Sequence, residues 1–138
     1  MSAFVLDASV AMSWCFEDEA DAAGDAVLRR LAGESASVPG IWPLEVANVL
    51  LGAERRKRIT AVESQRFLNL LEALPIEVDA QTASRASREI LALGRAHGLS
   101  SYDAAYLELS ARGGLPLATR DTRLAAAATS LGLTLLLP

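Results

Sequence analysis

Short apolar segments alternate with longer segments of helical periodicity along this sequence, and that alternation limits the possible folds more than any other feature. The apolar runs are typical of strands buried on both faces, as in a parallel sheet. Strands are expected at Ala3–Leu6, Ser37–Pro39, Ile76–Val78, Leu115–Ala118 and Thr134–Leu137. Strands separated by helices favour an α/β domain with a mostly parallel sheet and right-handed crossovers.

The helices between these strands carry start and stop signals. Thr60 and Glu63 have the spacing of a capping box, and Pro75 ends the helix that they begin. Gly98 is a typical stop for the helix before it. Helices are expected at Ser9–Phe16, Ala22–Leu31, Pro43–Arg56, Thr60–Leu74, Ala80–Ala96, Ser100–Arg112 and Thr122–Leu131. With no internal repeat or linker, residues 1–138 are expected to form one domain.

The composition restricts the available chemistry. Of the 138 residues 51% are hydrophobic, and Cys15 and His97 are the only cysteine and histidine. This excludes a disulfide framework, a cysteine-based zinc site and a histidine-pair mechanism. The chemistry is therefore expected to depend on carboxylates and hydroxyls. The first apolar run ends at Asp7 without a basic leader, so we expect no signal peptide and a cytoplasmic protein.

Several common ligand-binding motifs are absent from the sequence. The turn after the first expected strand contains no glycine, which excludes the dinucleotide fingerprint. The sequence also has no phosphate-binding glycine-rich loop followed by Lys-Ser/Thr and no Gly-x-Ser-x-Gly nucleophile elbow. These absences exclude the nucleotide-binding and hydrolase classes that depend on those turns.

The net charge of −4 is distributed unevenly. Residues 1–25 carry six acidic and no basic residues, whereas residues 26–138 carry 13 basic and 11 acidic ones. Arg55, Arg56 and Arg58 are candidate nucleic-acid contacts, because arginine suits bidentate contacts to phosphate. A run at a helix end also fits a solvated charged surface. The charge alone therefore does not identify a nucleic-acid-binding protein.

Four acidic residues stand where strands end or helices begin. Asp7 and Asp121 each follow an apolar run, and Glu45 and Asp103 lie in the first turns of expected helices. Taken singly, each can be a helix cap or a partner of the helix dipole. A parallel sheet would bring all four to the carboxyl ends of its strands. Crowded carboxylates favour a divalent cation such as Mg²⁺ or Mn²⁺.

Four blocks of the sequence resemble the signature motifs of PIN-domain nucleases, in particular the VapC-type toxins of bacterial toxin–antitoxin pairs. The blocks are Leu6-Asp7-Ala8-Ser9, Pro43-Leu44-Glu45-Val46-Ala47-Asn48, Ser101-Tyr102-Asp103-Ala104-Ala105-Tyr106-Leu107 and Leu117-Ala118-Thr119-Arg120-Asp121. They occur in the expected order over nearly the whole chain.

This resemblance implies a single PIN-like domain with a mostly parallel five-stranded sheet flanked by helices. It implies an endoribonuclease that depends on Mg²⁺ or Mn²⁺ and hydrolyses RNA phosphodiester bonds by metal-activated water. It also implies a homodimer and inhibition by a cognate VapB-like antitoxin.

The resemblance assigns roles to seven residues of this sequence. The expected metal ligands, which are also catalytic, are Asp7, Glu45, Asp103 and Asp121. Thr119 is a further expected catalytic residue, and Ser9 and Asn48 are expected to support the cluster.

Three alternatives stay open at the level of the sequence. The same site can serve a DNA-directed or structure-specific nuclease. The domain can be a catalytically silent regulatory one, although the presence of all four acids argues against this. A phosphatase or receiver domain with Asp7 as nucleophile usually needs a nearby lysine, and Lys57 stands far from the strand ends.

Overall fold

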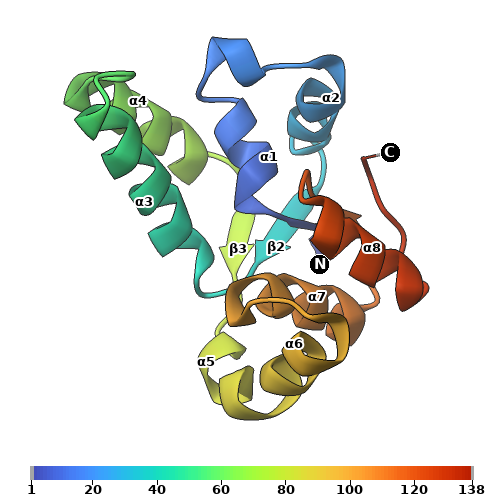
Figure 1. The fold of residues 1–138 in the computed structure, drawn as a ribbon. Coiled ribbons are helices and arrows are strands. Elements are labelled where there is room, and N and C mark those ends of the chain that lie inside the picture. Colours follow the sequence, from blue (N-terminus) through green and yellow to red (C-terminus); the bar gives the residue numbers. More distant parts are fainter. Residues whose placement is uncertain (1, 138) are drawn as a thin grey trace.

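A computed structural model describes residues 2–137, in which helices flank a parallel sheet (Figure 1). The strands are β1 (Ser2–Leu6), β2 (Ser35–Val38), β3 (Ile76–Val78) and β4 (Leu117–Ala118). Their order in the sheet is β3-β2-β1-β4, and each neighbouring pair is parallel. The sequence-based prediction of a parallel α/β fold is confirmed.

Strand β1 lies inside the sheet, between β2 and β4, and its apolar residues form the centre of the core. Phe4, Val5 and Leu6 are fully buried. The register opposite β4 pairs Leu6 with Ala118. The chain therefore leaves both strands at the same level, and the residues that follow them come out side by side.

The helices occupy most of the segments between the strands. They are α1 (Ala8–Ser13), the 3₁₀ turn η1 (Glu17–Glu19), α2 (Ala22–Arg30), α3 (Trp42–Arg55), α4 (Ala61–Glu72), α5 (Thr82–Arg85), the π-helical segment η2 (Ala86–Ile90), α6 (Leu91–His97), α7 (Ser101–Gly113) and α8 (Thr122–Ser130). In Figure 1, α3 and α4 lie together on the left, and α8 lies on the right beside the C-terminal segment. No helix within residues 2–137 is long and apolar enough to cross a membrane.

Capping residues and glycines in the sequence correctly predicted several helix ends. The capping box of Thr60 and Glu63 is present at the start of α4. Gly98 ends α6 with a left-handed backbone, at φ 65°. Ser100 caps α7 by accepting a hydrogen bond from the backbone N–H of Asp103 at 3.1 Å.

The helix expected at Ala80–Ala96 is not continuous. It is divided into α5, the π segment η2 and α6. A π turn contains an extra residue and so shifts the phase of the helix face that follows. Ile90 is the buried side chain here, packed with Ala104 and Ala105 of α7. Packing against α7 thus overrides the regular helical periodicity.

The fifth strand expected at Thr134–Leu137 is also absent, so the sheet has four strands within residues 2–137 rather than five. This segment makes an isolated bridge between Leu135 and Leu117. The N–H of Leu117 donates to the carbonyl of Thr134 at 2.9 Å, and the N–H of Leu136 donates to the carbonyl of Leu117 at 3.0 Å. Because β4 is only two residues long, its outer edge is too short to pair with a full strand.

A network of charged side chains connects β3 to α7. Arg112 donates to both carboxylate oxygens of Glu108, at 2.9 Å and 3.0 Å, and to Asp79 at 2.6 Å. Glu108 is only 4% exposed. The Arg112 guanidinium holds the pKa of Asp79 below its usual value. Arg112 therefore compensates a buried charge that no water molecule can solvate well.

We predict that Arg112→Ala destabilises the fold by about 3 kcal/mol, because the buried Glu108 carboxylate loses its hydrogen bonds from Arg112 and keeps an ion pair of 3.9 Å with Arg85. Glu34→Ala is the matched control, since Glu34 and Arg30 form an i,i+4 ion pair that is more than one third exposed. That variant is expected to lose less than about 1 kcal/mol. Chemical denaturation at neutral pH measures both values. Equal losses would contradict the role assigned to Arg112.

Candidate active site

The candidate site begins where β1 and β4 end together. The N–H of Asp7 donates to the carbonyl of Ala118 at 2.9 Å, which brings the turn after β1 against the turn after β4. Thr119 Oγ1 then donates to Asp7 Oδ2 at 2.6 Å and accepts from the N–H of Asp121 at 3.0 Å. Because the N–H of Asp121 occupies an acceptor position, the single hydroxyl proton of Thr119 is directed at Asp7.

Ser9 repeats this arrangement from the other turn. Its Oγ donates to Asp7 Oδ2 at 2.8 Å and accepts from the N–H of Arg120 at 3.1 Å. Two hydroxyls therefore converge on one carboxylate oxygen and hold the carboxylate in one orientation. Asp7 is 6% exposed. Burial raises its pKa, while the hydrogen bonds from Thr119 and Ser9 lower it.

Asp121 has a structural role in addition to its position beside Asp7. Its Oδ1 accepts a hydrogen bond from the N–H of Leu124 at 3.0 Å and so caps α8. The capping interpretation is therefore correct for this residue. Its charge also raises the pKa of both Asp7 and Asp103. Capping and membership of an acidic cluster are compatible, because the cap uses one carboxylate oxygen.

Glu45, in the first turn of α3, is held by a tyrosine from α7. Tyr106 is fully buried, and its hydroxyl donates to Glu45 Oε1 at 2.6 Å. The same hydroxyl accepts from the N–H of Ala8 at 3.3 Å. Burial, followed by the charge of Asp7 and the hydrogen bond to Glu45, raises the pKa of Tyr106. Tyr106 thus connects α7, α3 and the start of α1.

Tyr106 is a site residue to which the sequence analysis assigned no role. It belongs to one of the four motif blocks and stands three residues after Asp103, which places the two on neighbouring turns of one helix face. That spacing was an available signal. The identity of its partners was not, because Ala8 and Glu45 are 98 and 61 residues away in the sequence.

The four carboxylates interact electrostatically. Burial raises the pKa of Asp103, and the charges of Asp121 and Asp7 raise it further. Burial also raises the pKa of Glu45, as do the charges of Asp7 and Asp103, whereas the hydrogen bond from Tyr106 lowers it. Like charges act in this way only when they face the same region. The structure therefore brings together the four acids that the sequence singled out.

These acids suit a hard divalent cation by their chemistry, although they do not form a closed ligand cage. Within residues 2–137, no three acidic, histidine or cysteine side chains are arranged as a ready metal site. The donors are carboxylates, which Mg²⁺ and Mn²⁺ prefer, and they repel one another. Arg123 lowers the pKa of Asp103, but by less than Asp121 and Asp7 raise it. A cation at this position would relieve the remaining repulsion.

Of the other predicted residues, Asn48 lies near the acidic cluster, whereas the arginines lie away from it. Asn48 is exposed and lies, with Glu45, beside a shallow hollow at the start of α3. Arg55 lies at the opposite end of α3, about 15 Å from Glu45 along the helix axis. Arg58 pairs with acidic residues of η1 at 2.6 Å and 2.9 Å and covers the ring of Phe16.

Thus the structure does not join the arginine run to the acidic cluster. The residues concerned are Arg55, Arg56 and Arg58. The guanidinium of Arg58 is already engaged by acids of this same chain. A contact between these arginines and nucleic acid stays a prediction.

Comparisons with known proteins identify the fold. The chain resembles the crystal structure of PAE2754 from Pyrobaculum aerophilum, with a TM-score of 0.68, 22% sequence identity and coverage of 91% of this chain and 86% of the other. It also resembles the crystal structure of FitAcB from Neisseria gonorrhoeae, with a TM-score of 0.62, 20% identity and coverage of 96% and 95%. No curated protein matches the sequence.

The family comparison covers most of the chain. The PIN domain family matches residues 4–129, a segment that contains every strand of the sheet except the first two residues of β1. The match also includes the four interacting carboxylates and the hydroxyls that hold Asp7. This chain therefore belongs to the PIN domain family.

Proposed function

We propose that this PIN domain is a divalent-metal-dependent endoribonuclease and the toxin of a toxin–antitoxin pair. PIN domains are typically nucleases that use divalent metal ions. The observation that carries the proposal is the convergence of four mutually repelling carboxylates from four separate segments of the chain. A purely structural arrangement has no reason to gather like charges at one edge of a sheet.

In this proposal the metal ligands are Asp7, Glu45, Asp103 and Asp121. When bound, Mg²⁺ or Mn²⁺ would supply charge stabilisation at the phosphoryl oxygen and a lowered pKa for the attacking water. The chain's own residues orient the ligands. Thr119 and Ser9 hold the Asp7 carboxylate through Oδ2, and the Tyr106 hydroxyl holds Glu45 through Oε1. Asp7 and Glu45 are thus positioned before any substrate arrives.

The finer parts of the proposal rest on sequence resemblance. The four motif blocks resemble those of VapC-type toxins, and this supports RNA as the substrate, a VapB-like antitoxin as inhibitor and a homodimer. A cytoplasmic location is part of the proposal, and the single cysteine, Cys15, suits a reducing compartment.

Cleavage assays test the reaction and its metal dependence. We expect single-stranded RNA to be cut with Mg²⁺ or Mn²⁺ and spared in EDTA, with Asp103→Asn lowering the rate by orders of magnitude. Asp25→Asn, at an exposed acid of α2, is the matched control and should cleave like the parent. Full activity in EDTA, or undiminished cleavage by Asp103→Asn, would contradict the proposal. Cleavage of DNA with RNA spared would favour the DNA-directed alternative.

The burial and mutual repulsion of the carboxylates predict an unusual stability profile for Asp103→Asn. Because the pKa values of Asp7, Glu45 and Asp103 are raised, the folded protein takes up protons before the unfolded chain does as the pH falls from 7 toward 4. The burial of these charged groups and their mutual repulsion therefore cost stability at neutral pH, and this cost disappears in acid. The metal-free variant should match or exceed the stability of the parent at pH 7 and lose this advantage near pH 4.

Thermal melts with and without Mg²⁺ complete this test. The parent should gain about 2.7 kcal/mol at a hundredfold excess of Mg²⁺ over its dissociation constant. Asp103→Asn should gain much less. A variant that is less stable than the parent at pH 7 and equally stabilised by Mg²⁺ would mean that Asp103 serves only the helix dipole of α7.

Removing the tyrosine hydroxyl should show how firmly the acids are held. Tyr106→Phe leaves the Ala8 N–H and Glu45 Oε1 without their buried partner, so we expect a loss of about 1–2 kcal/mol in the free energy of unfolding. Tyr102→Phe is the matched control, because Tyr102 lies on the same helix and is 57% exposed. It should cost almost nothing. Chemical denaturation measures both, and equal losses would remove the special role of Tyr106.

A further inference from the structure

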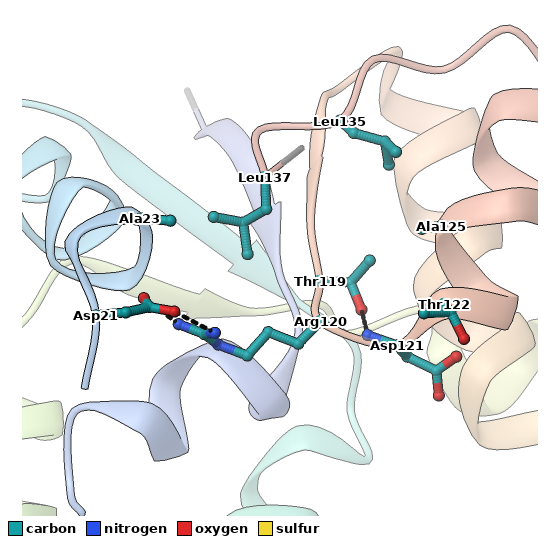
Figure 2. A pocket seen from close by; sticks show the side chains of 9 residues that line it. All are labelled: Asp21, Ala23, Thr119, Arg120, Asp121, Thr122, Ala125, Leu135 and Leu137. Carbon is teal, nitrogen blue, oxygen red and sulfur yellow. Dashed lines mark hydrogen bonds and ion pairs between the residues drawn. The ribbon is translucent and has the colours of Figure 1, made fainter. Parts of the chain in front are cut away.

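A cavity of about 400 Å³ lies directly beside the acidic cluster, and the positively charged side chain of Arg120 lines it (Figure 2). This volume falls within the range of small-molecule sites. Thr119, Arg120 and Asp121 line it from the turn after β4, and Leu135 and Leu137 line it from the C-terminal segment. The cavity therefore combines a positive group and an apolar surface next to the candidate active site.

The two ends of Arg120 are attached to different parts of the molecule. Its backbone N–H donates to Ser9 Oγ, the hydroxyl that also binds Asp7. Its guanidinium forms a bidentate pair with Asp21, with N–O distances of 2.6 Å and 2.8 Å, and also reaches Ser13 at 3.4 Å. The base of this side chain is thus part of the active site, while its tip is held against α2.

A glycine makes room for the tip of Arg120. A Cβ at Gly24 would lie 2.7 Å from the terminal Nη2 of Arg120 and 2.9 Å from Ser13 Oγ. Glycine inside a helix such as α2 costs stability relative to alanine. Because Gly24 has no Cβ, the guanidinium of Arg120 can lie against Asp21.

The ion pair between Arg120 and Asp21 is partly exposed to solvent. Its side chains are 31% and 47% exposed, and ion pairs of this kind contribute little in water. The guanidinium presents a planar pair of N–H donors, a geometry that fits phosphate as well as carboxylate. The same N–H donors of Arg120 that bind the Asp21 carboxylate therefore have the geometry to bind a phosphate group.

We infer that the cavity is a nucleotide subsite for a single-stranded RNA, with a phosphate bound to Arg120 in place of Asp21. This inference rests on the proposed function and deepens it. Leu135 and Leu137 offer the apolar surface for the adjoining base. The Asp121 carboxylate, which also lines the cavity, repels phosphate and so directs it to the Arg120 side. Binding of the strand then requires Arg120 to release Asp21.

Binding of a fluorescent single-stranded RNA in EDTA, followed by anisotropy at several salt concentrations, tests this subsite without cleavage. Arg120→Gln should weaken binding several-fold and reduce the slope of log K against log salt by about 0.7, as for one lost phosphate contact on a single strand. Arg66→Gln removes an exposed arginine from α4, a helix that contributes no residue to the cavity lining, and should leave the parent's affinity and slope unchanged.

Two further variants release Arg120 by independent routes. Asp21→Asn keeps a side chain able to cap α2 but weakens the ion pair, and Gly24→Ala pushes the guanidinium away. Both should bind the RNA several-fold more tightly than the parent. The gain from Gly24→Ala should vanish when Arg120→Gln is added. If Gly24→Ala folds poorly, the same comparison is made with Asp21→Asn.

The apolar half of the subsite has its own test. Leu135→Ala should weaken binding of ordinary RNA but not of an abasic strand with the same number of phosphates. Equal effects on both strands would overturn the base contact.

The phosphate contact is overturned if Arg120→Gln binds like the parent, if neither releasing variant binds more tightly, or if the parent does not bind RNA. Cleavage assays separate this inference from the proposed function. Metal-dependent cleavage of RNA with Arg120-independent binding refutes the subsite alone. Arg120-dependent binding without any cleavage refutes the nuclease alone.

Discussion

The pairing of β1 with β4 is the contact on which the rest of the site depends. Leu6 lies opposite Ala118, and the N–H of Asp7 continues the ladder beyond them. A slip of one residue would turn Asp7 and Thr119 to opposite faces of the sheet. Since β4 is only two residues long, the side-chain bonds from Thr119 and Ser9 to Asp7 also help to hold this register. The same hydrogen bonds therefore join the two strands and orient a candidate ligand.

The distribution of partners separates structural acids from those of the site. Arginines lie against several of the acids outside the cluster: Arg112 against Asp79 and Glu108, Arg58 against Asp18 and Glu19, and Arg120 against Asp21. Within the cluster, hydroxyl and backbone groups make the hydrogen bonds instead, and the charges are left to repel one another. The neighbouring helices and turns hold these carboxylates in place despite their repulsion, and a bound cation would reduce that repulsion.

The sequence predicted the features that depend on short-range chemistry. The capping box of Thr60 and the glycine stop at Gly98 agree with the structure. The first four strands are present where they were expected, although β2 begins earlier, at Ser35, and β4 is limited to Leu117–Ala118. Predictions that depended on packing were less successful. The π segment follows from the contact of Ile90 with α7, and the segment at Thr134–Leu137 lacks a strand because β4 offers too short an edge. Apolar residues signal burial in both segments, but burial alone does not specify backbone geometry.

The candidate site shows the same division. From sequence alone, Asp7, Glu45, Asp103 and Asp121 could be picked out, because strand ends and helix starts converge in a parallel α/β sheet. Only the tertiary structure decided which hydroxyl holds which carboxylate. Tyr106 joins Glu45 across 61 residues, and Arg120 pairs with Asp21 across 99.

The physical reason is the range of the interactions. Helix caps and strand periodicity depend on residues only a few positions apart, so a short segment of the sequence is enough to predict them. A hydrogen bond between distant segments depends on register, crossing geometry and the space left by a residue such as Gly24, and those exist only once the chain has folded.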